Sequence, residues 1–287
     1  MADFSVIIPA FNDGGCIRDA IESVLSQGFL RQVIVVDDGS SDDTADVVKA
    51  IKDNRVLLLR KENEGPALAR NAGAREATAS HLVFLDADDV LLTGALSAFA
   101  HQHDRGDLLV RGVAVVRRGR DVRSNPSVAS KFPYPRGSPL AGSFSVERRL
   151  FDELGGYDGE FRYGENSELL LRVALRLEAI GCSDGFISNE TVSCFEREGR
   201  KKDHYDVAKL KAAERMIDKH GHNLRKDFTT MSNHHAIVAH LLLMDGHASA
   251  ARHHAVRSLR FRPRSLRGWG RLALCILPLR RSRAARG

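Results

Sequence analysis

The feature that most constrains the fold of this chain is an apolar segment, residues 82–85, that runs directly into the carboxylates of Asp86, Asp88 and Asp89. A short apolar run bounded by turn residues is typical of a buried strand, and ligands of open α/β sheets bind beyond the carboxyl ends of such strands. Two carboxylates one residue apart at that position suit Mg²⁺ or Mn²⁺ held together with a substrate diphosphate. An isolated Asp-x-Asp pair is only a hypothesis, so its surroundings in the sequence decide its weight.

The segments before it repeat one strand–turn–helix pattern. Apolar runs at residues 4–9, 33–36 and 56–59 predict buried strands, and amphipathic stretches such as 16–26 and 67–77 predict the helices between them. Continuous apolar strands alternating with such helices predict an α/β fold, with a mostly parallel sheet covered on both faces. The first, second and fourth strands each end in a polar loop, and we expect these loops to converge on one edge of the sheet.

Four motifs follow one another along this region. They are SVIIPAFN at residues 5–12, VVDDGSSD at 35–42, NEGPALARNAG at 63–73 and FLDADD at 84–89. In this order they resemble the family 2 glycosyltransferases, which have the GT-A fold, a Rossmann-like sheet flanked by helices. The resemblance covers about two-thirds of the chain, from its start, and four motifs in one order are far more specific than any of them alone.

The resemblance implies a role for each motif. In the family, the first two motifs bind the nucleotide of a sugar-nucleotide donor, and the Asp-x-Asp pair binds a divalent metal ion and the diphosphate. The metal ligands in this sequence are then Asp86 and Asp88, with Mg²⁺ or Mn²⁺ as the cofactor. The implied nucleotide-binding residues are Pro9, Ala10, Phe11, Asn12, Asp38, Gly39, Arg70, Asp86 and Ala87.

Several of these residues also have a purely structural interpretation. Asp38 is the family's uracil-contacting position, where a carboxylate can accept the N–H of the base, but a turn aspartate that bonds its own backbone is the alternative. Phe11 either stacks on the base or belongs to the core. Arg70 either lies near the diphosphate or is a solvated helix arginine. Pro9 is expected to end its strand and to turn the residues after it toward the nucleotide.

The acceptor side is expected in residues 155–169, which resemble the family's acceptor segment. That segment normally ends in Gly-Glu-Asp, whose aspartate is the general base that deprotonates the acceptor hydroxyl. Here Asn166 occupies that position, and an amide cannot usefully accept the proton. Glu165 and Glu168 share a helix face, so either could replace it. Glu168 also precedes Arg172 by four residues, where a helix salt bridge is the alternative, and Asn166 could simply cap the helix.

Two basic segments lie outside these motifs. Residues 117–139 form a long Pro-containing stretch that we assign to the acceptor side, because a loop of that length inside a compact domain is usually functional or disordered. The second segment contains the basic residues Arg197, Arg200, Lys201 and Lys202. It could close over the diphosphate, but a solvated charge run is favoured.

Composition separates the end of the chain from the rest. The sequence has 43 basic and 37 acidic residues, and the 11 arginines from His247 onward occur without any acid, so the preceding part is net acidic. This distribution argues against nucleic acid as a partner and favours contact of the tail with an anionic membrane surface. We expect a GT-A nucleotide-sugar-binding and catalytic domain at 1–200 and a helical, arginine-rich extension at 201–287.

The last apolar stretch, residues 266–277, is too short to span a bilayer. An interfacial helix with Trp269 at the headgroup level fits it, and the alternatives are a helix docked on the catalytic domain or a helix-pair repeat for protein contact. The four cysteines have no metal or redox spacing, and the first residues do not form a signal peptide. These features predict a cytoplasmic protein, peripheral at the inner face of the membrane.

The sequence therefore predicts a metal-dependent glycosyltransferase. A sugar would pass from a nucleotide-sugar donor, with UDP favoured, to a glycan or lipid-linked acceptor of cell-envelope polysaccharide synthesis. Direct attack by a hydroxyl that Glu165 activates would invert the anomeric carbon, although Gly-Glu-Asn-x-Glu also occurs in some retaining transferases. The alternative is a catalytically impaired sugar-nucleotide-binding or scaffold protein of a glycan assembly system, which lost its base at Asn166.

Overall fold

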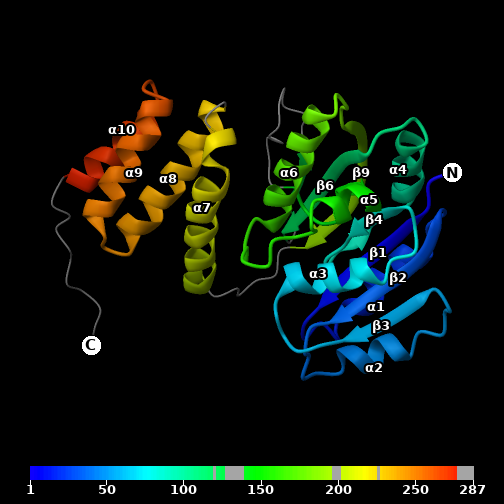
Figure 1. The fold of residues 1–287 in the computed structure, drawn as a ribbon. Coiled ribbons are helices and arrows are strands. Elements are labelled where there is room, and N and C mark those ends of the chain that lie inside the picture. Colours follow the sequence, from blue (N-terminus) through cyan, green and yellow to red (C-terminus); the bar gives the residue numbers. More distant parts are fainter. Residues whose placement is uncertain (119–120, 127–138, 196–201, 225–226, 277–287) are drawn as a thin grey trace. The chain divides into compact units, whose positions relative to one another are not determined.

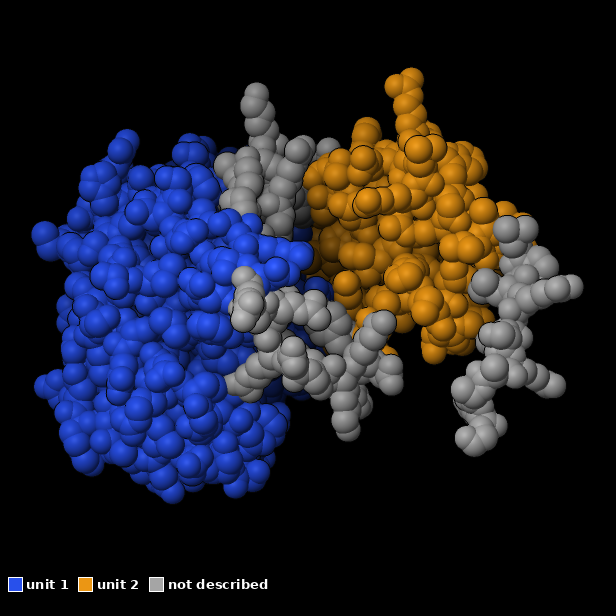
Figure 2. Space-filling model, turned by 180° about the vertical axis from the view of Figure 1, so that it is seen from behind, with its two compact units in different colours: residues 1–199 blue, residues 200–287 orange. Residues whose placement is uncertain are grey.

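The protein is described here by a computed structural model, in which two compact units are present, residues 1–199 and 200–287. They are coloured separately in Figure 2. The structure describes residues 1–118, 121–126, 139–195, 202–224 and 227–276.

Within its described residues, the first unit is built on one nine-stranded sheet (Figure 1). The hydrogen-bonded order is β3-β2-β1-β4-β8-β6-β9-β5, and β7 pairs with β6. In chain order the strands are β1 (Phe4–Ala10), β2 (Leu30–Asp37), β3 (Val56–Arg60), β4 (His81–Phe84), β5 (Val90–Leu91), β6 (Leu109–Arg118), β7 (Asp121–Pro126), β8 (Phe144–Glu147) and β9 (Gly185–Phe195).

The first four strands form the parallel half of the sheet, as predicted. β1 lies between β2 and β4 and is parallel to both, and β2 is parallel to β3. All seven residues of β1 are buried, which explains why the strand is apolar except for Ser5. Because the strands are parallel, the loops after β1, β2 and β4 leave the sheet at the same edge, which is called the carboxyl edge below.

The other half of the sheet is mixed. β8 is antiparallel to both β4 and β6, β9 is parallel to β6, and β5 is antiparallel to β9. β5 and β9 were not predicted from the sequence. β5 has two residues, and β9 carries Asn189 and Glu190 at exposed positions, residue types that strands disfavour. Pairing with neighbouring strands, which the local sequence does not reveal, makes these segments strands.

Alternate residues of β1 face two separate hydrophobic clusters. Val6 and Ile8 contribute to one and Ile7 to the other, since successive strand side chains point to opposite faces. Helices α1 (Ile17–Leu25), α2 (Thr44–Lys49) and α4 (Ala95–His103) cover the first cluster, and α3 (Pro66–Arg75), α5 (Arg148–Glu153) and α6 (Glu165–Ala179) cover the second.

Helix α3 packs especially closely on β1. A methyl carbon at Gly73 would lie 2.5 Å from Cγ2 of Ile7, so only glycine allows this approach. The contact holds Arg70 and Asn71 against the strand that leads into the carboxyl edge.

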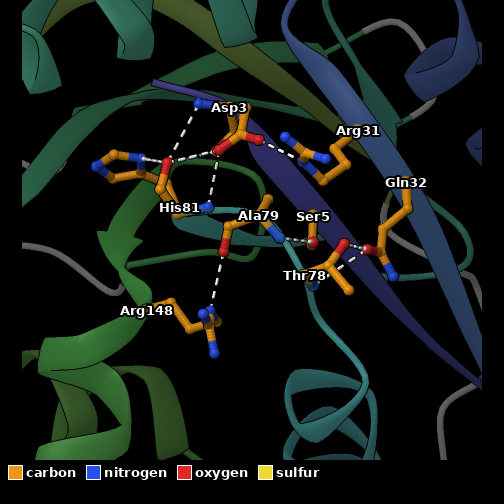
Figure 3. Close-up of polar contacts among 9 residues, drawn as sticks. Asp3, Ser5, Arg31, Gln32, Thr78, Ala79, His81 and Arg148 are labelled. Carbon is orange, nitrogen blue, oxygen red and sulfur yellow. Dashed lines mark hydrogen bonds and ion pairs between the residues drawn. The ribbon is translucent and has the colours of Figure 1, made fainter. Parts of the chain in front are cut away.

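The opposite, amino edge of the sheet carries a network of short polar contacts (Figure 3). One carboxylate oxygen of Asp3 accepts hydrogen bonds from the amide (2.8 Å) and the hydroxyl (2.6 Å) of Ser80, and the other accepts from Nε of Arg31. Nearby, Ser5 Oγ accepts from the amide of Ala79 at 3.2 Å, and Nε of Arg148 donates to the Ala79 carbonyl at 2.9 Å. The network joins the starts of β1, β2 and β4 to α5.

The part of the second unit that the structure describes consists of helices and their connections. Serines and histidines join α8 to α9: Ser232 and Ser258 each donate to the other's carbonyl, and Nδ1 of His235 lies 3.0 Å from Nδ1 of His254. Among the described residues no helix is long and apolar enough to cross a membrane. The helices are α7 (Lys202–Leu224), α8 (Phe228–Met244), α9 (Ala248–Phe261) and α10 (Leu266–Ile276).

Candidate active site

The loops after β1 and β2 are hydrogen-bonded to each other at the carboxyl edge. The amide of Asn12 donates to Ser40 Oγ at 2.9 Å, and Oδ1 of Asn12 accepts from the amide of Ser41 at 2.9 Å. Asn12 adopts a positive φ of 56°, a conformation that asparagine tolerates better than most residues. Asn12 therefore joins the two predicted nucleotide loops, through its backbone amide and through its side chain.

Phe11 projects from this structure with half of its surface exposed (50%). The interpretation as a core aromatic is therefore wrong, and its ring is available to a base. Ala10 remains buried, and β1 continues one residue past Pro9, which pairs in register with Val36. The strand therefore ends at Ala10 rather than at Pro9, and the chain turns toward the edge directly after it.

The two adjacent aspartates at the end of β2 have different partners. Asp37 accepts from the amide of Ser40 and from Nε of Arg60, both at 2.8 Å, and so holds its own turn. Asp38 accepts from the amide of Gly65 at 2.7 Å and from Nζ of Lys61 at 2.9 Å, and so holds the loop before α3. The self-bonding turn aspartate is thus Asp37.

Asp38 also accepts from the amide of Glu64 at 3.0 Å. The carboxylate is buried, so a base that binds here would meet an acceptor whose position the loop already holds. Gly39, with a φ of 82°, allows the turn, and a methyl carbon there would lie 3.0 Å from the Asn63 amide nitrogen.

Arg70 joins the donor-side and acceptor-side carboxylates. Its Nη2 donates to Oδ1 of Asp86 at 2.5 Å, and its Nη1 donates to Oε1 of Glu165 at 2.9 Å, although Glu165 is 95 residues away in the chain. Arg70 is only 2% exposed, so the interpretation as a solvated helix arginine is wrong. Burial disfavours its charged form, but the carboxylates of Asp86 and Glu165 outweigh this and hold the pKa of Arg70 above its ordinary value.

The Asp-x-Asp turn presents its carboxylates unequally. The side chain of Asp86 is 42% exposed, Asp88 is half-buried, and Ala87 between them is buried. Asp89 is buried too. It accepts from the amide of Phe195 and so joins the turn before β5 to the end of β9. Burial and the nearby charge of Asp86 raise the pKa of Asp89 to about 7.

Asp86 and Asp88 fit a magnesium or manganese ion by their chemistry, since both supply hard carboxylate oxygens. Within the described ranges, no group of three or more His, Cys, Asp or Glu side chains could hold a metal ion. A metal at the pair would therefore take its remaining ligands from water and from a diphosphate, which is how Mg²⁺ is usually bound with nucleotides.

The acceptor-side segment places Glu165 and Asn166 at the start of α6. The helix begins at Glu165 and its N-cap is Gly164, so Asn166 does not cap it. Oδ1 of Asn166 accepts a hydrogen bond from the buried Tyr157 hydroxyl at 2.9 Å. The ring of Tyr157 lies 5.4 Å from the guanidinium carbon of Arg70. The amide at the family's usual base position is therefore bound to Tyr157, beside Arg70.

Glu168 is completely buried (0%) and pairs with Arg172. Nε of Arg172 lies 2.8 Å from Oε1, and Nη2 lies 2.7 Å from Oε2, while Nη1 donates to the carbonyl of Leu154 at 2.8 Å. The predicted alternative, a helix salt bridge, is confirmed. Of the two glutamates, Glu165 is the one that Arg70 connects to Asp86 of the Asp-x-Asp pair.

Asn71, which belongs to the third predicted motif, binds the backbone of Tyr157: its side chain accepts from the Tyr157 amide and donates to the Tyr157 carbonyl, both at 2.8 Å. Two other contributors to the site were not predicted from the sequence. Arg60 and Lys61 form ion pairs with the two aspartates at the end of β2, Asp37 and Asp38. A basic pair at the point where a strand ends is the one local signal that could have pointed to them.

Parts of the predicted acceptor side fall outside the described residues. Of residues 117–139, the structure describes β7, which pairs with β6, but not residues 119–120 and 127–138. Arg197, Arg200 and Lys201 also lie outside the described residues, and Lys202 begins α7.

Comparison with known proteins gives a family match. The family model for glycosyl transferase family 2 matches residues 5–160, slightly more than half of the 287-residue chain. This range includes the polar loops after β1, β2 and β4, and it ends before Glu165.

Curated relatives match over part of their length. A GalNAc(5)-diNAcBac-PP-undecaprenol beta-1,3-glucosyltransferase of Campylobacter jejuni is 37% identical over 183 residues, 59% of this chain and 59% of the relative. WfaP of Escherichia coli, a UDP-Glc:alpha-D-GlcNAc-diphosphoundecaprenol beta-1,3-glucosyltransferase, is 37% identical over 99 residues, 34% of this chain and 39% of the relative. An uncharacterized glycosyltransferase of Rickettsia bellii is 41% identical over 97 residues, 33% of this chain and only 14% of the relative. The chain thus spans less than two-thirds of the length of these proteins.

Solved structures share the fold. TarS of S. aureus superposes with a TM-score of 0.57 at 16% identity, covering 90% of this chain and 88% of that chain. The same protein in complex with UDP-GlcNAc gives a TM-score of 0.57 at 19% identity, covering 95% of this chain and 79% of that chain. The predicted GT-A arrangement with a helical C-terminal region is confirmed at the level of the fold.

Proposed function

Because this chain belongs to glycosyl transferase family 2, we propose that it transfers a sugar from a nucleotide-sugar donor to a hydroxyl group of a lipid-linked glycan. UDP is the favoured nucleotide. The observation that carries the proposal is Arg70, which joins Asp86 to Glu165 and so brings a donor-side carboxylate beside an acceptor-side one. The names of two relatives, which act on undecaprenol-linked diphosphate sugars, support the acceptor class.

The nucleotide would bind over the joined loops after β1 and β2. Phe11, half-exposed, offers a face for the base, and Asp38 offers a carboxylate for its N–H. Pro9, Ala10, Asn12 and Gly39 shape the backbone around them. Since Arg70 is buried between two carboxylates, its contribution is to hold Asp86 and Glu165 in place rather than to contact the diphosphate.

A divalent cation would be held by Asp88 and the exposed side of Asp86. When bound, Mg²⁺ or Mn²⁺ neutralises charge on the departing nucleoside diphosphate. Family membership supports this cofactor, and the carboxylate pair after β4 fits it.

Glu165 is the residue we assign as the general base. Its carboxylate takes the proton of the acceptor hydroxyl, the oxygen forms a bond to the anomeric carbon, and the bond from that carbon to the diphosphate breaks. Direct displacement of this kind inverts the anomeric centre. Glu168 was the other candidate base, and its burial in the ion pair with Arg172 favours a role in holding α6 against residues 154–156.

We also propose a division of labour along the chain. Residues 1–200 carry catalysis, and residues 201–287 bring the enzyme to an anionic membrane surface on the cytoplasmic side. In α10, Leu266 and Trp269 are exposed by 87% and 54%, and Arg267 lies between them. Such a helix suits the interface of a bilayer. Co-sedimentation with anionic vesicles at low salt, compared with a chain ending at Pro263, tests this: equal sedimentation of both would contradict it.

The proposed activity is tested by incubating the protein with UDP-sugars, a diphosphate-linked lipid acceptor and Mn²⁺, and by following sugar incorporation. Transfer that chelation abolishes supports the proposal. Donor binding without transfer, for every sugar and acceptor tried, would instead support a sugar-nucleotide-binding protein impaired at Asn166. The absence of any nucleotide binding would contradict both.

A further inference from the structure

Three cations of the carboxyl edge are already matched by carboxylates. Arg60 lies 2.8 Å from Asp37, Lys61 lies 2.9 Å from Asp38, and Arg70 is shared between Asp86 and Glu165. A diphosphate would bring further negative charge to an edge that also contains Asp88. Phosphate groups are normally met by arginine, lysine or metal ions, so the substrate needs positive charge beyond these three side chains.

Arg162 differs from these three paired cations. It lies between the buried Phe161 and Glu165, is exposed, and makes no ion pair with any carboxylate of the described residues. Its guanidinium lies across Gly65: a methyl carbon built there would overlap Nη1 and come within 2.9 Å of Cζ. The charged group therefore lies at the loop that Asp38 binds through the amide of Gly65.

Gly65 makes this placement possible. Its φ of 92° is disfavoured for residues with a side chain, and any side chain would displace the Arg162 guanidinium. The loop before α3 thus leaves room for an arginine from the segment that carries Glu165. The guanidinium of Arg162 consequently lies at the loop that Asp38 holds, and its segment leads into α6, which begins with the proposed base Glu165.

We propose that Arg162 binds a phosphate group of the diphosphate ester that the enzyme uses as substrate. The planar guanidinium can donate two parallel hydrogen bonds to a phosphate, which gives both charge and orientation. The inference rests on the proposed function, because both the donor and the lipid-linked acceptor of that reaction carry a diphosphate. Its position at the Gly65 loop places Arg162 on the donor side of Glu165.

The test compares Arg162→Ala and Arg162→Lys with the wild-type full chain, by calorimetric titration of uridine and UDP with Mn²⁺. Loss of a charged hydrogen-bonding group should weaken UDP binding about 10- to 100-fold while leaving uridine binding unchanged. Lysine should restore part of the loss, because it keeps the charge but not the paired geometry. Arg149→Ala is the matched control, because Arg149 is also an exposed arginine but lies at the amino edge. It belongs to α5, which follows the end of β8, and that end pairs with the start of β4.

A second arm separates the two sources of phosphate. If Arg162→Ala leaves UDP binding unchanged but raises the KM for a diphosphate-linked acceptor at least about 10-fold, the bound phosphate is the acceptor's and the inference stands. Unchanged UDP affinity together with an unchanged acceptor KM would overturn it, and so would an equal loss of uridine and UDP binding. A wild-type protein that binds no nucleotide and transfers no sugar would overturn the proposed function and this inference together.

Discussion

The two edges of the sheet in the first unit carry similar residues, which serve different purposes. At the amino edge, Asp3 is enclosed by Ser80 and Arg31, and His103 is held between the carbonyl of Asp107 at 2.6 Å and Ser145 Oγ at 2.5 Å. At the carboxyl edge, Phe11 is half-exposed and the side chain of Asp86 is 42% exposed. One edge satisfies its polar groups internally, whereas the other keeps binding capacity for a ligand.

This difference shows why the site lies where it does. Parallel strands bring the loops after β1, β2 and β4 together without any contribution from the ligand. The amino edge holds the same three strands at their starts, so that the loops at the far end are fixed in space (Figure 3). Mutations at the carboxyl edge should therefore alter activity, and mutations at the amino edge should alter stability.

The largest expected effect belongs to Glu165→Gln. The substitution keeps the size of the side chain and its contact with Arg70 but removes the group that accepts the proton. General-base catalysis contributes about 10²- to 10⁴-fold, so kcat should fall by that factor with donor affinity preserved. A transfer assay beside a UDP titration measures both, and a full rate in this variant would place the base elsewhere.

Glu168→Gln should act on stability rather than on chemistry. It removes one partner of a completely buried ion pair and leaves Arg172 uncompensated, which typically costs about 3–5 kcal/mol of the free energy of unfolding. Urea denaturation followed by circular dichroism measures the loss. A stable Glu168→Gln protein without transfer activity would reverse the assignment of the two glutamates.

His103→Phe is the matched substitution at the amino edge. It keeps a flat ring against His81 but leaves Ser145 and the Asp107 carbonyl without their partner, at a cost of about 1–3 kcal/mol. Transfer by the folded protein should be unchanged. A clear drop in kcat with an unaltered melting temperature would contradict the separation of the two edges.

The same residue predicts a pH dependence. Burial, together with the neighbouring His81, lowers the pKa of His103 from 6.5 to about 3, so the folded protein keeps the ring neutral where the unfolded chain takes up a proton. Stability from this source is complete above pH 6.5 and is lost as the pH falls toward about 3. Between these pH values, the melting temperature should fall less steeply with decreasing pH for His103→Phe than for the wild type.

The smallest effect is expected at Asp3. Although burial opposes it, the hydrogen bonds from Ser80 and Arg31 lower the pKa of Asp3 to about 2, so its contribution is present above the ordinary pKa of 3.8 and fades as the pH falls toward about 2. The pair with Arg31 is partly exposed, and such pairs contribute about 1 kcal/mol or less. Asp3→Asn should therefore lower the melting temperature slightly at neutral pH and not at pH 2, which scanning calorimetry can resolve.

Sequence alone was sufficient where structure is local. The apolar runs of β1, β2 and β4 and the polar residues directly after them follow from strand periodicity, and parallel pairing then brings those residues to one edge. It was insufficient where the decisive partner is distant in the chain. The burial of Arg70 depends on Glu165, 95 residues away, and the state of Asn166 depends on Tyr157. β9 is held as a strand by β6, which its own polar residues do not reveal.

Calorimetric titration of UDP with and without Mn²⁺ tests the central claim most directly, that the carboxyl edge is a nucleotide site completed by a metal ion. Asp88 lies in a half-buried turn after β4, so Asp88→Ala opens no core cavity and should leave the melting temperature unchanged. We expect Mn²⁺-dependent UDP binding in the wild type and in His103→Phe, and its loss in a folded Asp88→Ala protein. Undiminished Mn²⁺-dependent affinity in Asp88→Ala would contradict the account.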